Sequence, residues 1–309
     1  MHDIEAALEA HRNEALVPDA AVEAFLTQAQ AFAQLATGNS LALSAADLAD
    51  VVAVKERTLC LLTGWFDRLI ALTEERRRNL VRYDGIGVVS LGCDCWGRAV
   101  LSRWGLKKTA KLGEQTGPFD LAVHPPETVS ALIANDFSGY LEPDQLAYRE
   151  ADSICVHSRY HVTFNHEVGP AYAADGFRRL RDTYSRRIAN LRAALADPRP
   201  LALVVHVPPF IELSTDRTDR LQQTCDQIVA GRRSPTVMIV LDSCTPGQPV
   251  PTEERETASF LLRHVVTPAP EYVWHLPQCY MSEAGHAYER RLVAIVAERL
   301  DRLQAAATG

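Results

Sequence analysis

The chain has 309 residues, of which 47% are hydrophobic and 23% charged, and its formal net charge is −7. This length allows one large domain or two smaller ones with a sizeable core. The acidic balance gives no reason to expect nucleic acid or an acidic membrane surface as a partner. No uncharged apolar stretch is long enough to cross a bilayer. The acidic, amphipathic start also lacks the basic segment and apolar run of a secretory signal.

Seven cysteines are scattered along the chain, at positions 60, 93, 95, 155, 225, 244 and 279. Their number is odd and their spacing shows no disulfide framework. This pattern favours free thiols in a reducing compartment. We therefore expect a cytoplasmic protein.

Residues 1–82 are predicted to be helical throughout. A first helix runs to a break at Pro18, a second begins at Asp19, and a longer one carries apolar residues at helical spacing from Leu48 to Leu69. After "RYDGIG" the pattern changes. We treat residues 1–82 as a separate N-terminal region through which the protein could bind a partner or self-associate.

From residue 86 onward, short apolar runs rich in β-branched residues alternate with amphipathic helical segments. The expected strands are 86–91, 201–207, 236–242 and 271–276, and the expected helices are 95–104, 126–136, 173–197, 215–230 and 281–305. Such alternation predicts an α/β domain over 83–309, with a parallel sheet covered on both faces. The stretch 106–172 fits this pattern less well and is rich in loops.

Ligands of parallel α/β sheets bind beyond the carboxyl ends of the strands. The polar residues expected at these ends are therefore candidates for a site. They are Cys93, Asp94 and Cys95 after the first strand, His206 after the second, Asp242 and Cys244 after the third, and His275 in the last.

The segment "SLGCDCWGR" places two cysteines where the first strand turns into a helix. A thiol at a helix start feels the partial positive charge of unpaired backbone amides, which favours the thiolate and could form an oxyanion hole. Gly92 would let the backbone pass close to a substrate. Asp94 is better suited to capping the helix, since its charge opposes ionisation of the neighbouring thiol. Two small buried residues in a tight turn would produce the same pattern.

A metal or redox site at Cys93 and Cys95 is a further alternative. Two thiolates spaced C-x-C need two more ligands for a structural zinc site, and no second close pair of Cys or His residues stands nearby. A disulfide between these two cysteines would close a very small, strained loop.

Several short motifs occur in a characteristic order: "SLGCDCWGRAVLSRWGLKK", "GPFDLAV" (117–123), "ETVSALIANDFSGYL" (127–141) and "VTFNHE" (162–167). In this order they resemble a bacterial domain family of unknown function that is catalogued as papain-like cysteine peptidases. The resemblance covers roughly residues 86–170 well, the C-terminal part loosely and the N-terminal helices not at all.

The resemblance implies Cys95 as the family cysteine, Asp120 as the acid of Pro-Phe-Asp, and His166 as the histidine, with Asn165 beside it. In such a set, histidine takes the thiol proton and the carboxylate orients the imidazole. Cys93 falls where the family motif varies, so its role stays open.

The sheet pattern itself is similar to the flavodoxin-like SGNH hydrolases and acyltransferases, with Cys95 in place of their serine. Those enzymes carry Asp-x-x-His before the last helix, whereas this chain has Pro277 and Tyr280 at the corresponding positions. The histidine must therefore come from elsewhere, first from His166, and otherwise from His206 or His275.

We expect an enzyme of acyl-transfer type, a cysteine-dependent hydrolase, peptidase or acyltransferase that acts on a small-molecule or peptide acyl substrate. Cys95, His166 and Asp120 are the expected catalytic residues. The expected supporting residues are Gly92, Asp94, Trp96, Asn135, Asn165, His206 and Asp242. No nucleotide-binding signature is present, and we expect no cofactor. A non-catalytic binding or scaffold protein with a structural Cys-x-Cys turn is the alternative function.

Overall fold

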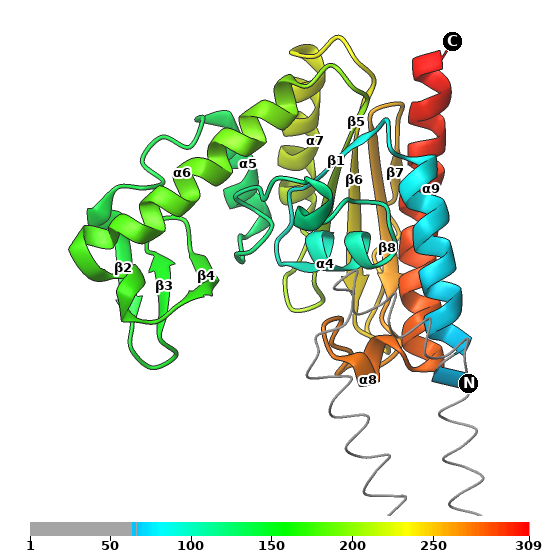
Figure 1. Cartoon of the computed structure of the whole chain (residues 1–309), viewed down its shortest axis with the longest axis horizontal. Helices are drawn as coiled ribbons and strands as arrows, with labels where there is room; N and C mark the ends of the chain where they lie inside the picture. Colours follow the sequence, from blue (N-terminus) through cyan, green and yellow to red (C-terminus); the bar gives the residue numbers. More distant parts are fainter. Residues whose placement is uncertain (1–63, 66, 309) are drawn as a thin grey trace, which may run out of the picture.

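The computed structural model describes residues 64–65 and 67–308 of the chain (Figure 1). Residues 64–65 and 67–82 are helical, and residues 1–63 and 66 of the predicted N-terminal helical region lie outside the described residues. All described cysteines are free thiols, as predicted, while Cys60 lies outside that part. Within the described part, no helix combines the length and apolar character needed to span a membrane.

The main sheet consists of four parallel strands and one short antiparallel strand. In spatial order they are β1 (Gly87–Ser90), β5 (Leu201–Val207), β6 (Thr236–Cys244), β8 (Phe260–Val266) and β7 (Arg255–Glu256). The parallel strands thus follow one another in space in the order of the sequence. A flavodoxin-like sheet instead has strands on both sides of its first strand. Here β1 lies at the edge of the sheet formed by the described residues.

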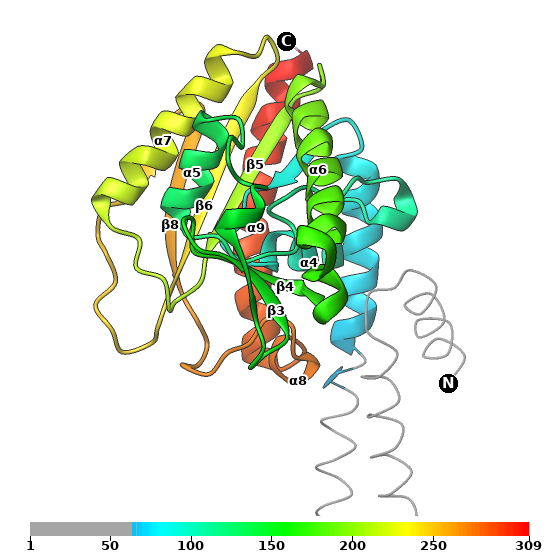
Figure 2. The ribbon, with the colours of Figure 1, turned by 90° about the vertical axis from the view of Figure 1, so that its left-hand side faces the viewer.

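Helices cover both faces of this sheet (Figures 1 and 2). The helices are α4 (Trp96–Arg103), α5 (Pro126–Ala134), α6 (Ala174–Ala196), α7 (Thr215–Ala230), α8 (Pro277–Tyr280) and α9 (Glu283–Thr308). One apolar core joins the sheet to α5, α6 and α7, and a second joins it to the helix over 67–82, to α4 and to α9. The strand β5 is buried along its whole length because alternate side chains enter the two cores.

The stretch 106–172, which the sequence predicts to be rich in loops, contains a second sheet. Its strands are β2 (Leu146–Arg149), β3 (Ile154–His157) and β4 (Val162–Val168), all antiparallel, and the short 3-10 turns of the region are Ala110–Leu112, Pro143–Gln145 and Pro170–Tyr172. This sheet forms a lobe beside the main sheet, with α6 running from the lobe toward the main sheet (Figure 1). The core that contains α5–α7 continues into the lobe.

One predicted strand is wrong. Residues 271–276 form turns and irregular backbone, and the fourth parallel strand is β8, which ends at Val266. Consequently His275 is not at a strand end but lies exposed in an irregular segment before α8. The other three predicted strands are present, and β6 extends two residues further than expected, to Cys244.

Candidate active site

The two cysteines of the Cys-Asp-Cys turn lie in different surroundings. Cys93 is fully buried in the apolar core on the α5–α7 side of the sheet. Its backbone amide donates to the carbonyl of His206. Cys95 is the residue from which α4 begins, and 5% of it is exposed. Gly92 makes the turn possible, since a Cβ at this position would overlap the backbone carbonyl of Asp94. No described group of potential metal ligands includes either cysteine.

The strand β4 is irregular at the motif that contains His166. Cys155 of β3 pairs with Phe164, but the preceding Ile154 pairs with Val168. Residues 165–167 are therefore extra relative to β3 and form a bulge. Bulges redirect side chains out of the regular alternation. Here both Asn165 and His166 are exposed, although consecutive residues of a regular strand face opposite ways.

This bulge brings His166 to Cys95. The Nε2 atom of His166 lies 3.0 Å from the Sγ atom of Cys95, a hydrogen-bonding distance for a thiol. The Nδ2 atom of Asn165 lies 3.9 Å from the same sulfur. The contact joins the start of α4, at the main sheet, to the lobe strand β4, 71 residues later in the chain.

The third residue of the bulge, Glu167, fixes the bulge to α6. Glu167 is buried and accepts hydrogen bonds from the guanidinium of Arg187, at 2.7 Å, and the hydroxyl of Tyr184, at 3.1 Å. Both partners belong to α6. Because Glu167 points inward, its two predecessors in the bulge point outward toward Cys95. The sequence prediction missed this anchor, since Tyr184 and Arg187 lie 17 and 20 residues after Glu167 and outside the motif that contains it.

The thiol of Cys95 and the imidazole of His166 are both favoured in their neutral forms. Burial, together with the negative charge of Asp94, raises the pKa of the Cys95 thiol to about 12, and the Asn165 amide only partly opposes this. Burial lowers the pKa of His166 below its ordinary value; the charge of Glu167 opposes this shift, while the charges of Arg187 and Arg98 add to it. The resting pair is therefore a thiol beside a neutral imidazole, not a thiolate–imidazolium ion pair.

Asp94 caps the turn, as its position predicts. Its Oδ1 atom accepts a hydrogen bond from the backbone amide of Trp96 at 3.0 Å. The same carboxylate contacts His206 Nδ1 at 3.2 Å and accepts from the indole of Trp274 at 3.2 Å. Asp94 therefore connects the turn to His206 and Trp274, and no described contact joins it to His166.

His206 continues this network away from Cys95. Its Nε2 atom lies 2.9 Å from Ser243 Oγ, which in turn lies 2.6 Å from the hydroxyl of Tyr288 on α9. The imidazole stacks on the indole of Trp96, with ring centres 4.6 Å apart. Both His206 and Trp96 are buried within this packing. The structure thus places both in support of the turn, and Ser243 and Tyr288 are members that the sequence prediction missed.

Asp120 is buried near the pair but makes other contacts. Its Oδ2 atom accepts from the amide of Gly117 at 2.6 Å and lies 3.5 Å from the guanidinium of Arg98. Its Oδ1 atom is buried without a partner, and no hydrogen bond or ion pair joins Asp120 to His166 among the described residues. The expected orienting contact is therefore not present. The charge of Asp120 does reach Cys95, where it contributes to the raised pKa of the thiol.

Two further predicted residues lie away from the Cys95–His166 pair. Asn135 follows the last residue of α5, and its side-chain amide donates to the hydroxyl of Tyr160 at 2.8 Å. This bond connects the end of α5 to the lobe. Asp242 lies at the end of β6 and pairs with His264, a residue that the sequence prediction did not consider.

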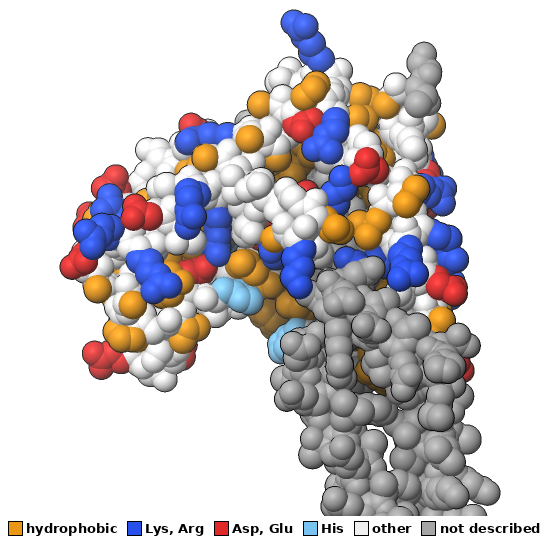
Figure 3. Space-filling view, in the orientation of Figure 1, with side chains coloured by type: hydrophobic (Ala, Val, Ile, Leu, Met, Phe, Trp, Pro, Cys, Tyr) orange, Lys and Arg blue, Asp and Glu red, His pale blue; other side chains and the backbone are white. Residues whose placement is uncertain are grey.

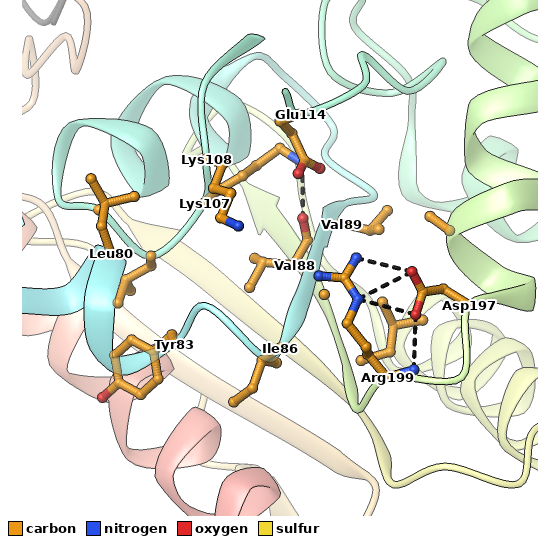
Figure 4. A pocket seen from close by; sticks show the side chains of 15 residues that line it. Leu80, Tyr83, Ile86, Val88, Val89, Lys107, Lys108, Glu114, Asp197 and Arg199 are labelled. Atoms are coloured by element: carbon orange, nitrogen blue, oxygen red, sulfur yellow. Dashed lines mark hydrogen bonds and ion pairs between the residues drawn. The ribbon is translucent and has the colours of Figure 1, made fainter. Parts of the chain in front are cut away.

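The surface is hollowed between the lobe and the main sheet, with histidine and hydrophobic side chains facing the hollow (Figure 3). A separate cavity of about 50 Å³ lies at the amino-terminal end of β1 (Figure 4). Its charged residues already have partners: Arg199 pairs with Asp197, Lys107 with Glu114, and Lys108 with Asp84 outside the cavity. This cavity has room for little more than water and is not the candidate site.

Comparisons with protein-family models, with curated proteins and with solved structures find no match for this chain. The geometry of the site is therefore the basis for a functional proposal.

Proposed function

We propose that the protein is a cysteine-nucleophile enzyme of acyl-transfer type, with Cys95 as nucleophile and His166 as general base. The observation that carries this proposal is the 3.0 Å contact between Cys95 Sγ and His166 Nε2. A thiol next to an imidazole is the arrangement required for an activated nucleophile. The motifs that resemble the papain-like family point to the same two residues.

The raised pKa of Cys95 assigns a specific task to His166. A thiol with a pKa of about 12 holds very little thiolate at neutral pH, so it needs a base that removes its proton during attack. The neutral imidazole has a free electron pair for this purpose. As the sulfur bonds to the acyl carbon, the thiol proton passes to His166 Nε2.

The resulting imidazolium then returns this proton to the leaving group, whose bond to the acyl carbon breaks. A thioester on Cys95 remains. Water, or another acceptor nucleophile, attacks the thioester while His166 takes the acceptor's proton. The Cys95 sulfur leaves, recovers a proton and completes the cycle. The acceptor decides between hydrolysis and acyl transfer.

Amide groups near Cys95 are suited to stabilising the oxyanion of this reaction. The amide of Trp96 is engaged by Asp94, which removes one of the donors expected from the helix start. The amides of Cys95 and Gly97 donate to no described residue and are available for a substrate oxygen. The side-chain amide of Asn165, 3.9 Å from the sulfur, is a third donor near the pair.

Labelling with a thiol-reactive acyl probe tests the proposal. The wild-type protein should form one thioester at Cys95, located by peptide mass spectrometry, and Cys95→Ala should abolish it. Cys93→Ala is the matched control, because this cysteine is two residues away but fully buried. His166→Ala should slow labelling by about 10²-fold or more, since general-base assistance contributes on this scale.

A non-catalytic protein with a structural turn gives a different result. In that case labelling of Cys95 would be no faster than that of the other partly exposed thiols, and His166→Ala would leave its rate unchanged. Equal labelling of the Cys95→Ala and Cys93→Ala variants would also overturn the proposal.

A further inference from the structure

A second cluster of reactive side chains lies on the neighbouring strands β6 and β8. Asp242 and His264 are register partners on these strands, and Cys244 follows Asp242 two residues later on the same face. One ligand atom from each of these residues lies within 4.8 Å of the other two. This set of nitrogen, oxygen and sulfur donors comes from two strands and therefore has a rigid frame.

The hydrogen bonds of His264 leave a place for a cation. Its Nδ1 atom lies 2.7 Å from Asp242 Oδ2, and its Nε2 atom lies 3.1 Å from the backbone carbonyl of Glu253. Both ring nitrogens thus face oxygen acceptors, whereas a neutral imidazole carries only one N–H group. One of the two contacts therefore needs an added proton, and a metal ion bound in place of that proton would satisfy the same atoms once they move apart.

The contact to Glu253 indicates which side a metal would occupy. Histidines that bind metals commonly donate their other ring N–H to a backbone carbonyl or carboxylate, which fixes the ring and its tautomer. Here Nε2 faces such a carbonyl, so Nδ1 is the atom that would bind the metal. It points at the carboxylate of Asp242, whose other neighbour is the Cys244 sulfur, 3.8 Å from Oδ2.

We propose that Asp242, Cys244 and His264 form a zinc-binding site with one coordination position open to solvent or to a ligand. Thiolate, imidazole and carboxylate together favour zinc over the hard cations magnesium and calcium. Three protein ligands leave a fourth tetrahedral position unfilled, as is typical of zinc sites that bind water or substrate.

The distances require only a small adjustment. Tetrahedral zinc, with bonds of about 2.0–2.3 Å, separates its ligand atoms by roughly 3.3–3.6 Å. The sulfur-to-oxygen distance of 3.8 Å is already close to this range. The 2.7 Å contact between His264 and Asp242 must open by less than about 1 Å when zinc replaces the proton.

The site combines buried ligands with a route to solvent. The side chains of His264 and Asp242 are 4% and 8% exposed, which shields the ligands from competing water. Cys244 is only partly buried, at the end of β6, and so provides the approach. On binding, zinc displaces the thiol proton of Cys244 and the proton between His264 and Asp242.

Metal content and spectroscopy test the site in the full-length protein. After loading with zinc and dialysis against a weak chelator, we expect about one zinc ion per chain. Cobalt substitution should give a thiolate-to-cobalt charge-transfer band and intense visible bands of a tetrahedral centre. Cys244→Ser should remove the charge-transfer band and lower zinc affinity at least tenfold. Cys279→Ser, which alters another partly exposed thiol, should leave both unchanged.

A second readout does not depend on the folding of variants. In the wild-type protein, zinc should protect Cys244 from alkylation while Cys279 reacts at its original rate, as followed by peptide mass spectrometry. Retained zinc that is unaffected by Cys244→Ser, or alkylation of Cys244 that zinc does not slow, would show that the ion binds elsewhere and overturn the proposal. Cys95→Ala should retain the metal, so failure of the acyl-transfer proposal and failure of this site are distinguishable.

Discussion

Glu167, directly after His166, accepts a 2.7 Å hydrogen bond from Arg187 on the far side of the bulge from Cys95. The residue that faces the nucleophile and the residue that fixes the strand to α6 are therefore neighbours in the chain. A displacement of Glu167 must move His166 as well, because one peptide bond connects them. The ion pair thus acts as a positioning device for the proposed base.

The first prediction concerns Glu167→Gln. The change keeps the size of the side chain but removes the charge that pairs with the largely buried Arg187. We expect a loss of stability of about 1–4 kcal/mol, measured by urea unfolding, because a buried charge loses its partner. We also expect at least a tenfold fall in the rate of Cys95 acylation as His166 shifts.

Arg192→Gln provides the matched control. Arg192 also belongs to α6 and also forms an ion pair, with Asp136, but both side chains are more than half exposed. Exposed pairs contribute little, so neither stability nor acylation should change appreciably. If Glu167→Gln acylates at the wild-type rate, the ion pair does not position His166.

The second prediction concerns pH. His166 acts as a base only when it is neutral, and its pKa lies below the ordinary value of 6.5. The acylation rate should therefore rise with pH and pass through half its maximum below pH 6.5. In His166→Ala only the thiolate reacts. Because the thiol pKa is about 12, that rate should keep rising about tenfold per pH unit from pH 7 to 10. Parallel profiles of wild type and variant, measured by stopped-flow acylation, would contradict the assigned role.

A third prediction concerns His124, which is fully buried. Its Nδ1 atom lies 3.3 Å from the carbonyl of Ala122 and its Nε2 atom 2.8 Å from the hydroxyl of Tyr140. Burial lowers its pKa to about 3. Between pH 6.5 and 3 the unfolded state therefore binds a proton that the folded state does not.

It follows that stability should fall as the pH is lowered through this window, by up to about 1.4 kcal/mol per pH unit from His124 alone. Urea unfolding at a series of pH values measures this slope, and His124→Gln should make it shallower. His161→Asn is the control, because His161 lies exposed in a turn with a positive φ that asparagine tolerates. An unchanged slope in His124→Gln would assign the acid sensitivity to other groups.

The sequence predicts the sheet better than it predicts the lobe, for physical reasons. Long, wholly apolar runs such as 201–207 are distinctive because both faces of these strands are buried. The strand β8 was missed because Arg263 and His264 interrupt its apolar pattern, and both find partners, Glu256 and Asp242, only in the folded sheet. The short lobe strands carry even less of a pattern.

For the candidate site, local motifs indicated Cys95 and His166, which the structure brings together. The motifs could not show that Asp120 binds Gly117, or that Glu167 pairs with Arg187, because these contacts depend on how the chain folds back on itself. The same holds for the chain of contacts from Asp94 through His206 to Ser243, which joins three strand ends.

A fourth prediction concerns that chain of contacts. Asp94 is buried and contacts the amide of Trp96, the ring of His206 and the indole of Trp274. Asp94→Ala removes the carboxylate and with it all three contacts. We expect the free energy of unfolding, measured with urea, to fall by about 2–4 kcal/mol. His206→Phe keeps the stacking on Trp96 and leaves Asp94 two partners, so it should reduce stability less.

Asp216→Ala, at an exposed helix start, is the control and should change stability by less than about 1 kcal/mol. Equal losses in Asp94→Ala and Asp216→Ala would show that the network contributes no more than an ordinary helix start.

The last prediction concerns the close approach of α4 to β1 below the Cys-Asp-Cys turn. A Cβ added at Gly97 would overlap both Oγ and Cβ of Ser90 on β1. Gly97→Ala should therefore destabilise the protein by about 1–3 kcal/mol through overpacking, and should slow acylation because the helix that begins at Cys95 is pushed outward. Ser90→Gly removes the colliding atoms. The double variant should recover most of both losses, and the coupling energy in a double-mutant cycle should be at least about 1 kcal/mol. If instead the two losses simply add, the strand and the helix adjust independently, and the position of Cys95 does not depend on this contact.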